Sequence, residues 1–132
     1  MPLTDVQGGA RLVAFAAMPP SSRYRQLVEE LVKQTREGQG QVAAGRARAG
    51  VWNPRADAQS APDQHNYNIL LSRLSAPDRE ILAEMLSKEF VRGVHTVLST
   101  LNHAGVSPFE EGYQGTPAHD FMGRLGGWRW PV

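Results

Sequence analysis

Side chains that can bind a metal ion or move a proton recur every fourth residue at His95, Ser99 and His103. An imidazole titrates near neutral pH, so His95 is a candidate base or ligand. However, residues eight apart on a helix are separated by about 12 Å, which is too far for one metal ion to bridge. Metal-binding pairs on a helix use spacings of three or four residues. The pattern therefore predicts no metal site on this helix and a hydrogen-bonded structural role for His95.

A second group of chemically capable side chains stands near the C-terminus. It comprises His119, Asp120, Arg124, Trp128, Arg129 and Trp130. One interpretation is a clasp, in which Asp120 pairs with Arg124 and the two tryptophans bury against a long helix. The other is a pocket in which His119 and Asp120 act as acid and base while an arginine holds an anion. Adjacent helical residues point about 100° apart, so His65 or His95 would have to complete such a pocket. We favour the clasp.

Basic residues and a tryptophan mark a third candidate, the segment between Gly38 and Ala56. It contains Arg46, Arg48, Trp52 and Arg55 and no acidic residue. Such a segment can grip phosphates and stack a base, but arginines in a glycine-rich loop are usually solvated. The helix junction at 74–75 suggests a helix-turn-helix only loosely, because the helix that follows opens with acidic residues that phosphates repel. We therefore expect no binding of nucleic acid.

Signatures of catalysis are absent from the sequence. It contains no Gly-x-Ser-x-Gly elbow, phosphate-binding glycine loop, dinucleotide fingerprint or zinc-protease motif. It also lacks cysteine, which excludes disulfides, thiolate metal sites and a cysteine nucleophile. Catalytic residues can be far apart in the sequence and come together in the folded protein, so the absence of motifs does not exclude an enzyme. We expect no cofactor and no metal, and we favour a protein that is not an enzyme.

The elements that must position these residues start with a repeated tetrapeptide. Ser-Ala-Pro-Asp occurs at 60–63 and 75–78, and each copy precedes an apolar-periodic run. Serine can supply an N-cap oxygen, proline fits the first helical turn, and aspartate favours the positive end of a helix. The repeat predicts one helix over 62–74 and a second that begins at Ala76. The core positions expected on the first helix are Tyr67, Leu70, Leu71 and Leu74.

The second of these helices is predicted to be long. Its apolar positions are Ile81, Leu82, Met85, Leu86, Phe90, Val94, Val97, Leu98 and Leu101. They predict an unbroken helix over 76–103, ended by Gly105, whose apolar stripe other helices cover from end to end. Gly93 in the middle predicts a close approach of another backbone or ring. Glu84 and Lys88 predict an i, i+4 ion pair on the outside.

The other elements are shorter. Apolar periodicity predicts a helix over 23–37 with Gly38 as its C-cap, and Thr-Pro at 116–117 opens a final helix that ends near 125. A weak helix is expected over 4–17. Residues 38–59 are expected to be loop-rich and mobile in their glycine-arginine part, with Trp52 anchored. The alternative for that part is a short helix over 42–48.

The chain has the size and composition of one soluble domain. Its 132 residues include 41% hydrophobic and 20% charged residues, and its formal net charge of +1 gives no global attraction to nucleic acid or anionic lipid. No apolar run reaches the roughly 20 residues that span a bilayer, so no membrane contact is expected. The apolar run at 12–18 is short for an export signal, Asp5 lies upstream of it, and Arg11 is the only basic residue before it, so no export signal is expected. The absence of cysteine and the excess of arginine over lysine favour a bacterial cytoplasmic protein.

Several short patterns resemble a known family. They are Asn68-Ile69-Leu70-Leu71 before a Leu-Ser junction, Gly93-Val94-His95 followed by Leu98 and Leu101, Trp52 before a proline-bearing turn, and the ending Asp120-Phe121…Arg124…Gly127…Trp130-Pro131. Together they resemble a family of small bacterial proteins catalogued as a domain of unknown function. The resemblance covers His65–Pro131. It implies a helical fold and a tail that belongs to the domain, and it implies no activity, cofactor or partner.

The sequence thus predicts an all-α fold, a small bundle of four to five helices around the long helix, with an irregular C-terminal segment packed across it. One domain is expected over 1–132. We expect a non-enzymatic binding protein, either a homo-oligomer or bound to an unknown partner, because the long apolar helix has more surface than its neighbours cover. The alternative is a small-molecule binding protein or enzyme with a pocket between the long helix and the tail. Its candidate ligand-binding residues are His65, His95, Asp120, Arg124 and Trp130.

Overall fold

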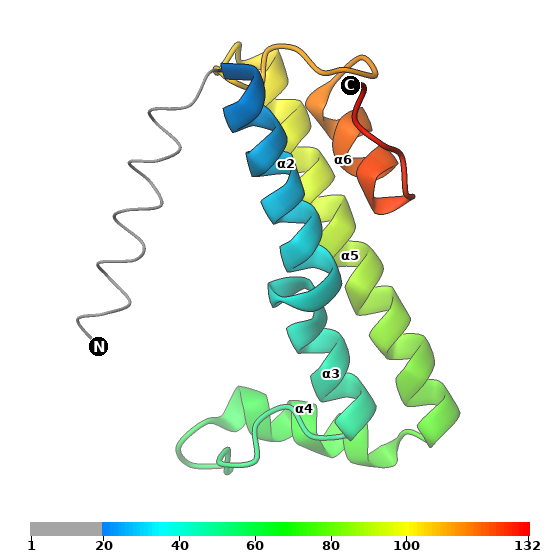
Figure 1. The fold of residues 1–132 in the computed structure, drawn as a ribbon. Helices are drawn as coiled ribbons and strands as arrows, with labels where there is room; N and C mark the ends of the chain where they lie inside the picture. The colour runs from blue at the N-terminus through cyan, green and yellow to red at the C-terminus, as the bar shows by residue number, and fades with distance from the viewer. Residues whose placement is uncertain (1–19) are drawn as a thin grey trace, which may run out of the picture. The chain divides into compact units, whose positions relative to one another are not determined.

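The computed structural model describes residues 20–132, and these form helices and no β-strand (Figure 1). The α-helices are α2 (Pro20–Glu37), α3 (Val42–Ala49), α4 (Pro62–Arg73), α5 (Ala76–His103) and α6 (Pro117–Leu125), and the 3-10 helix η1 spans Gln39–Gln41. The all-α prediction is confirmed. The helix expected over 4–17 and the apolar run at 12–18 lie outside the described residues. No helix between 20 and 132 is long and apolar enough to cross a bilayer.

The described residues form two compact units. The central unit is the continuous stretch 33–95, and the terminal unit combines residues 20–32 with 96–132. Both α2 and α5 therefore contribute residues to each unit. The expectation of one domain over 1–132 stays a prediction.

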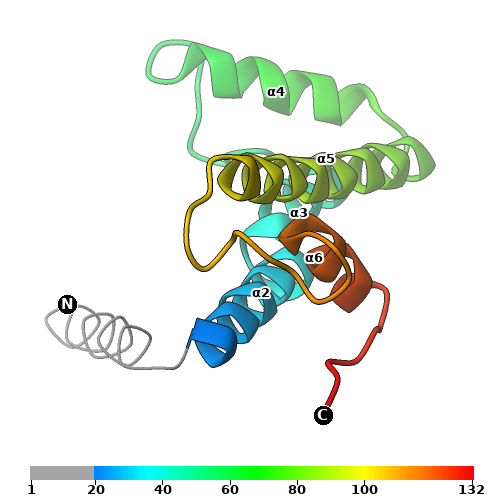
Figure 2. The ribbon, with the colours of Figure 1, turned by 90° about the horizontal axis from the view of Figure 1, so that it is seen from above.

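In the terminal unit, α6 packs against the first part of α2 (Figure 2). Val28 of α2, Leu98 of α5 and Phe121 of α6 are almost completely buried and supply the core. The start of α6 follows its sequence signal, because Thr116 Oγ1 accepts the backbone N–H of His119 at 3.3 Å. The predicted final helix is thereby confirmed.

The two Ser-Ala-Pro-Asp copies start their helices in different registers. In the second copy Ser75 is the N-cap of α5, since its Oγ accepts the backbone N–H of Asp78 at 3.2 Å. In the first copy Ala61 takes the cap position of α4, and its methyl group cannot accept a hydrogen bond. The N–H of Ser60 is instead held by Asp57 at 2.7 Å. The expectation that Ser60 caps α4 is wrong, although the helix begins where it was predicted.

The segment after α2 contains a packed helix. Ala44 and Ala47 of α3 are fully buried, so the expectation of a mobile glycine-arginine stretch is wrong and the helical alternative is confirmed. Trp52 is anchored as expected, because Asn68 Oδ1 accepts its backbone N–H at 2.7 Å. The same oxygen accepts the N–H of Asn53 at 3.1 Å, and Asn68 Nδ2 donates to the Asn53 carbonyl at 2.7 Å. Helix α4 thereby fixes the turn that carries the indole.

Helix α5 is unbroken over its 28 residues, as predicted. Gly105 follows its last turn with φ +66°, a left-handed conformation that suits glycine. Among the described residues, no neighbouring atom lies within 4 Å of the position that a Cβ on Gly93 would take. The expected close approach at Gly93 is therefore wrong. The predicted pair on the outside is confirmed, with 2.9 Å between Lys88 Nζ and Glu84 Oε1.

Alanines dominate the core of the central unit. Its buried residues are Ala44, Ala47, Leu71 and Ala83. Small side chains allow neighbouring helices to approach closely, and α5 turns the face centred on Ala83 inward. Ile81 and Met85 stand two residues to either side of Ala83, about 160° away around the helix. They are 57% and 58% exposed, so the prediction of an apolar stripe covered from end to end is wrong there.

Helix α4 also leaves apolar side chains outside the core. Leu71 is buried and Leu74 packs against the core, as expected. Tyr67 and Leu70 are 46% and 53% exposed, so their assignment to the core is wrong. The small alanine side chains of the core again leave these larger side chains at the surface.

Candidate interaction surface

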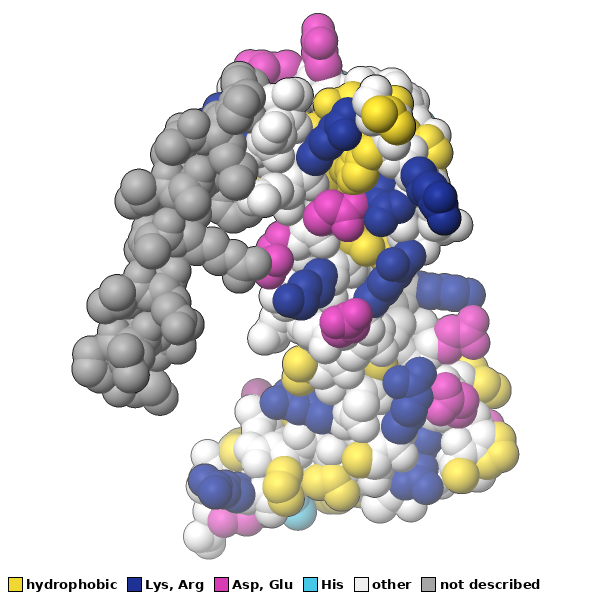
Figure 3. Space-filling model, viewed as in Figure 1, with side chains coloured by type: hydrophobic (Ala, Val, Ile, Leu, Met, Phe, Trp, Pro, Cys, Tyr) yellow, Lys and Arg dark blue, Asp and Glu magenta, His cyan; other side chains and the backbone are white. Residues whose placement is uncertain are grey.

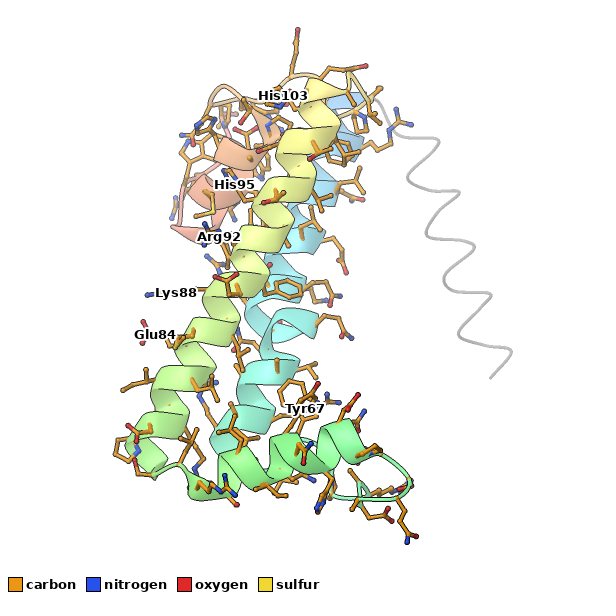
Figure 4. All side chains as sticks on the ribbon, turned by 180° about the vertical axis from the view of Figure 1, so that it is seen from behind. Tyr67, Glu84, Lys88, Arg92, His95 and His103 are labelled. Atoms are coloured by element: carbon orange, nitrogen blue, oxygen red, sulfur yellow. The ribbon has the colours of Figure 1, made fainter. Side chains whose placement is uncertain are left out.

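The five residues predicted to line a pocket divide between the two units. Asp120, Arg124 and Trp130 belong to the terminal unit, whereas His65 and His95 belong to the central unit. His95 is exposed on α5 (Figure 4), and its side chain makes no hydrogen bond among the described residues, so its expected hydrogen-bonded role is wrong. His65 is half-buried on α4. The pocket itself stays a prediction.

Asp120 is a fully buried carboxylate that joins three segments of the terminal unit. Its Oδ2 accepts hydrogen bonds from the hydroxyl of Tyr24 and the backbone N–H of Tyr113, each at 2.6 Å. Its Oδ1 accepts the backbone N–H of Gln114 at 2.7 Å. Burial and the hydrogen bond to Asp120 raise the pKa of Tyr24 above its ordinary value of 10. These bonds occupy both carboxylate oxygens with structural partners.

A single carboxylate of α2 holds both α6 and the C-terminal tail. Glu29 Oε1 accepts hydrogen bonds from Arg124 Nε and, at 2.8 Å, from Trp130 Nε1. Arg124 Nη1 also donates to the Trp128 carbonyl. The predicted pair between Asp120 and Arg124 is therefore wrong, because Arg124 takes its acidic partner from another helix. The tail contacts α2 through Pro131 and Trp130. The expected burial of the tryptophans against the long helix stays a prediction.

Aromatic rings and Arg25 also join the C-terminal tail to α2. The Arg25 guanidinium lies over the rings of Tyr113 and Trp130, at 4.6 and 5.4 Å from their centres. Arg25 also donates to the Tyr113 hydroxyl and to the Pro131 carbonyl, both at 3.0 Å. Trp130 in turn meets the rings of Tyr24 and Tyr113 edge-on. Such contacts support the clasp interpretation of the C-terminal group.

The central unit carries an apolar groove between α4 and α5. Its volume is about 310 Å³, and it is lined by Trp52, Tyr67, Leu70, Leu71, Leu82 and Leu86. Figure 3 shows hydrophobic side chains at the surface over α4. Ile81 and Met85 add two more exposed apolar side chains on α5. The groove and these two residues are here called the α4–α5 surface.

Trp52 forms a rigid wall of the groove. Asn68 fixes its backbone, and Tyr67 meets its ring edge-on with 5.8 Å between ring centres. The guanidinium of Arg46 also lies over the indole, 5.2 Å from its centre. A side chain with a fixed backbone and two ring contacts loses little freedom when a ligand binds, which lowers the entropy cost of binding.

Charges along α5 are largely paired with one another or with α3. Arg48 of α3 donates to Glu80 at 2.9 Å, and this bond raises the pKa of the guanidinium. On the outside of α5 the side chains of Lys88 and Arg92 follow each other (Figure 4), each with an acidic neighbour on the same helix. Within residues 20–132, no group of three or more histidines and acids can hold a metal ion.

Sequence reasoning missed the groove, although a signal was present. Tyr67 and Leu70 stand at i, i+3, and Ile81 and Met85 at i, i+4, so each pair marks an apolar face. Periodicity reports such faces without saying whether they are covered. In the folded protein alanines fill the core, and these larger side chains are left at the surface.

Comparisons with known proteins give a family and no function. The model of a family described as "Family of unknown function (DUF6547)" matches residues 19–132. No curated protein and no solved structure matches the chain.

Proposed function

The chain belongs to the family of unknown function DUF6547, and we propose that it is a non-enzymatic interaction protein that binds a second copy of itself through the α4–α5 surface. The observation that carries this proposal is the exposure of Tyr67 and Leu70, which line an apolar groove, together with the exposure of Ile81 and Met85 on α5. The bacterial origin and cytoplasmic location expected from composition are part of the proposal.

Exposed apolar area of this kind is costly in water and favours association. Each square ångström of apolar surface removed from water contributes about 25 cal/mol. Contiguous apolar patches with polar rims are typical of surfaces that bind other proteins. A groove between two helices suits the apolar face of a third helix, which a second copy can supply with Ile81 and Met85 of its own α5.

Charges beside the surface suit a symmetric pair. Arg73 follows Leu70 by three residues on α4, and Asp78 precedes Ile81 by three residues on α5. A two-fold axis places the same surface on both copies, so a base of one copy can meet an acid of the other twice. The net charge of +1 adds little long-range repulsion between copies.

Sedimentation equilibrium over a range of concentrations tests this function. The expected mass at high concentration is twice the 14.5 kDa of one chain. Leu70→Glu should yield a monomer with an unchanged circular dichroism spectrum, because Leu70 is exposed and its replacement leaves the core intact. Val97→Glu is the matched control, since Val97 is 57% exposed and does not line the groove. A monomer at every concentration, or equal effects of the two substitutions, would contradict the proposal.

A further inference from the structure

A second hollow also has Trp52 in its wall and is bounded by α3, the turn after it and α4. Its volume is about 820 Å³. Among its walls, Val42 and Val51 are apolar, whereas Gln41, Asn53 and Gln64 are amides. The proposed function does not account for it.

The electrostatics of this cavity are one-sided. Arg46 is the one charged residue among those that line it, and no carboxylate lines it. The guanidinium is exposed and lies over the Trp52 ring at 5.2 Å, with no acidic partner among the described residues. Arg48, two positions along, is by contrast bound to Glu80 at 2.9 Å. Arg46 is thus a positioned cation that retains its hydrogen-bond donors.

A side-chain amide adds a second donor. Gln64 Oε1 accepts a hydrogen bond from Asn53 Nδ2 at 2.5 Å, which directs the oxygen of that amide to the protein. Its Nε2 has no partner among residues 20–132, and the amide lines the cavity. Gln41, whose Nε2 donates to the Thr35 carbonyl at 3.0 Å, leaves its amide oxygen as an acceptor in the wall. The donors are the charged Arg46 guanidinium and Gln64 Nε2, and together they favour an anion.

The cavity also has room for a carbon skeleton. Gly45 lines it, and a Cβ built on Gly45 would meet no neighbouring atom within 4 Å in the described structure. Val42 and Val51 offer apolar walls close by. The cavity offers little for a nucleobase to stack on, because Arg46 already lies over the Trp52 ring and Tyr67 makes an edge-on contact with that ring.

We propose that this cavity binds a small organic carboxylate. The planar guanidinium of Arg46 would take the carboxylate oxygens through two parallel N–H bonds, Gln64 would donate a further bond, and the two valines would contact the apolar body. A single cation matches a single negative charge, which favours a carboxylate over a doubly charged phosphate. The inference does not depend on the proposed dimer, so the Leu70→Glu monomer is expected to bind equally well.

Titration with hexanoate, followed by ¹H–¹⁵N correlation spectra, tests the site. The Trp52 indole and Arg46 Nε resonances should shift saturably at constant ionic strength. Arg46→Gln should weaken binding about tenfold or more, as expected for loss of a charged hydrogen-bond partner. Arg55→Gln is the matched control, because it removes the same charge from an exposed arginine of the next turn that does not line the cavity.

Two further ligands and one further variant distinguish a carboxylate site from a general anion site or a purely apolar one. Hexanamide, the neutral analogue, and inorganic phosphate should both shift these resonances far less than hexanoate. Gly45→Leu should abolish binding without unfolding, since its side chain enters open space. Equal affinity for hexanamide, equal losses in the two arginine variants, unchanged binding in Gly45→Leu, or no saturable shift would each overturn the proposal.

Discussion

The hydroxyl of Tyr24 donates a 2.6 Å hydrogen bond to Oδ2 of Asp120, a residue 96 positions further along the chain. Both side chains are buried, at 3% and 0% exposure. The same carboxylate accepts the backbone N–H groups of Tyr113 and Gln114. This buried carboxylate of α6 therefore holds both α2 and the segment between α5 and α6. The stability of the terminal unit depends on it.

Replacement of Asp120 by alanine should be among the most damaging single changes in the terminal unit. It leaves a hydroxyl and two backbone N–H groups without acceptors, and we expect a loss of about 3 kcal/mol or more in the free energy of unfolding. Tyr24→Phe removes one of these bonds and should cost about 1–2 kcal/mol. Urea denaturation measures both. Met122→Ala, an exposed change on α6, is the control, and equal losses in all three would contradict the assignment.

The raised pKa of Tyr24 predicts a loss of stability in alkali. Burial and Asp120 hold the folded-state pKa above the ordinary value of 10, so above pH 10 the unfolded chain releases a proton that the folded chain retains. The linked stability is complete below pH 10 and falls as the pH rises further. The difference in unfolding free energy between wild type and Tyr24→Phe should therefore be smaller above pH 10 than at pH 8. A constant difference over this range would contradict the prediction.

Asp57 predicts the opposite trend in acid. Hydrogen bonds from the backbone and side chain of Ser60, and from the backbone of Gln59, lower its pKa below the ordinary 3.8. The ionised form is favoured in the folded state, so the contribution to stability is present above pH 3.8 and is lost as the pH falls through the folded-state value. Asp57→Asn should remove this dependence. Urea titrations at pH 6 and pH 2.5 should show the two proteins closer in stability in acid.

Glu29 should control how the tail packs. Glu29→Ala removes the acceptor shared by Arg124 and Trp130, and we expect a cost of about 1 kcal/mol because the pair is partly exposed. Tryptophan emission should shift to longer wavelength as the indole loses its partner. Glu37→Ala, which removes an exposed acid from the end of the same helix, should leave the emission unchanged.

Two glycines of the α5 region should respond to alanine with opposite signs. Gly93 is exposed inside the helix with open space around it, so Gly93→Ala should stabilise the protein by up to about 1 kcal/mol. Gly105 has φ +66°, which an alanine adopts only with strain, so Gly105→Ala should cost about 1 kcal/mol. Thermal melting of the two variants measures the difference. Destabilisation by Gly93→Ala would show that α5 has a close neighbour at this position.

Helix positions were predictable because they depend on local signals. The bounds of α5 and α6 and the end of α2 follow from periodicity, prolines and glycines in the sequence itself. The cap of α4 was not predictable from the sequence. The two copies of the tetrapeptide are identical, yet Ser75 is the N-cap of α5 whereas Ser60 lies one residue before the N-cap of α4. The choice of register depends on which face of each helix reaches the core, and that is a tertiary property.

The candidate sites were harder, for a related reason. Asp120, Arg124 and Trp130 stood out by residue type, but their partners Tyr24 and Glu29 lie on α2, far away in sequence. Nothing in a local pattern identifies such partners. The α4–α5 surface was missed because leucine and methionine at helical spacing are normally core, and alanines take that role here.

The separation of Tyr24 and Asp120 in sequence has a consequence for engineering. Their contact closes a loop of nearly one hundred residues, and the entropy lost on closure grows only with the logarithm of loop length. About ten residues added to the exposed turn that contains Ala58 and Gln59 would therefore raise this cost by roughly 0.1 kcal/mol. That turn offers a place to graft a reporter peptide while leaving the buried carboxylate undisturbed.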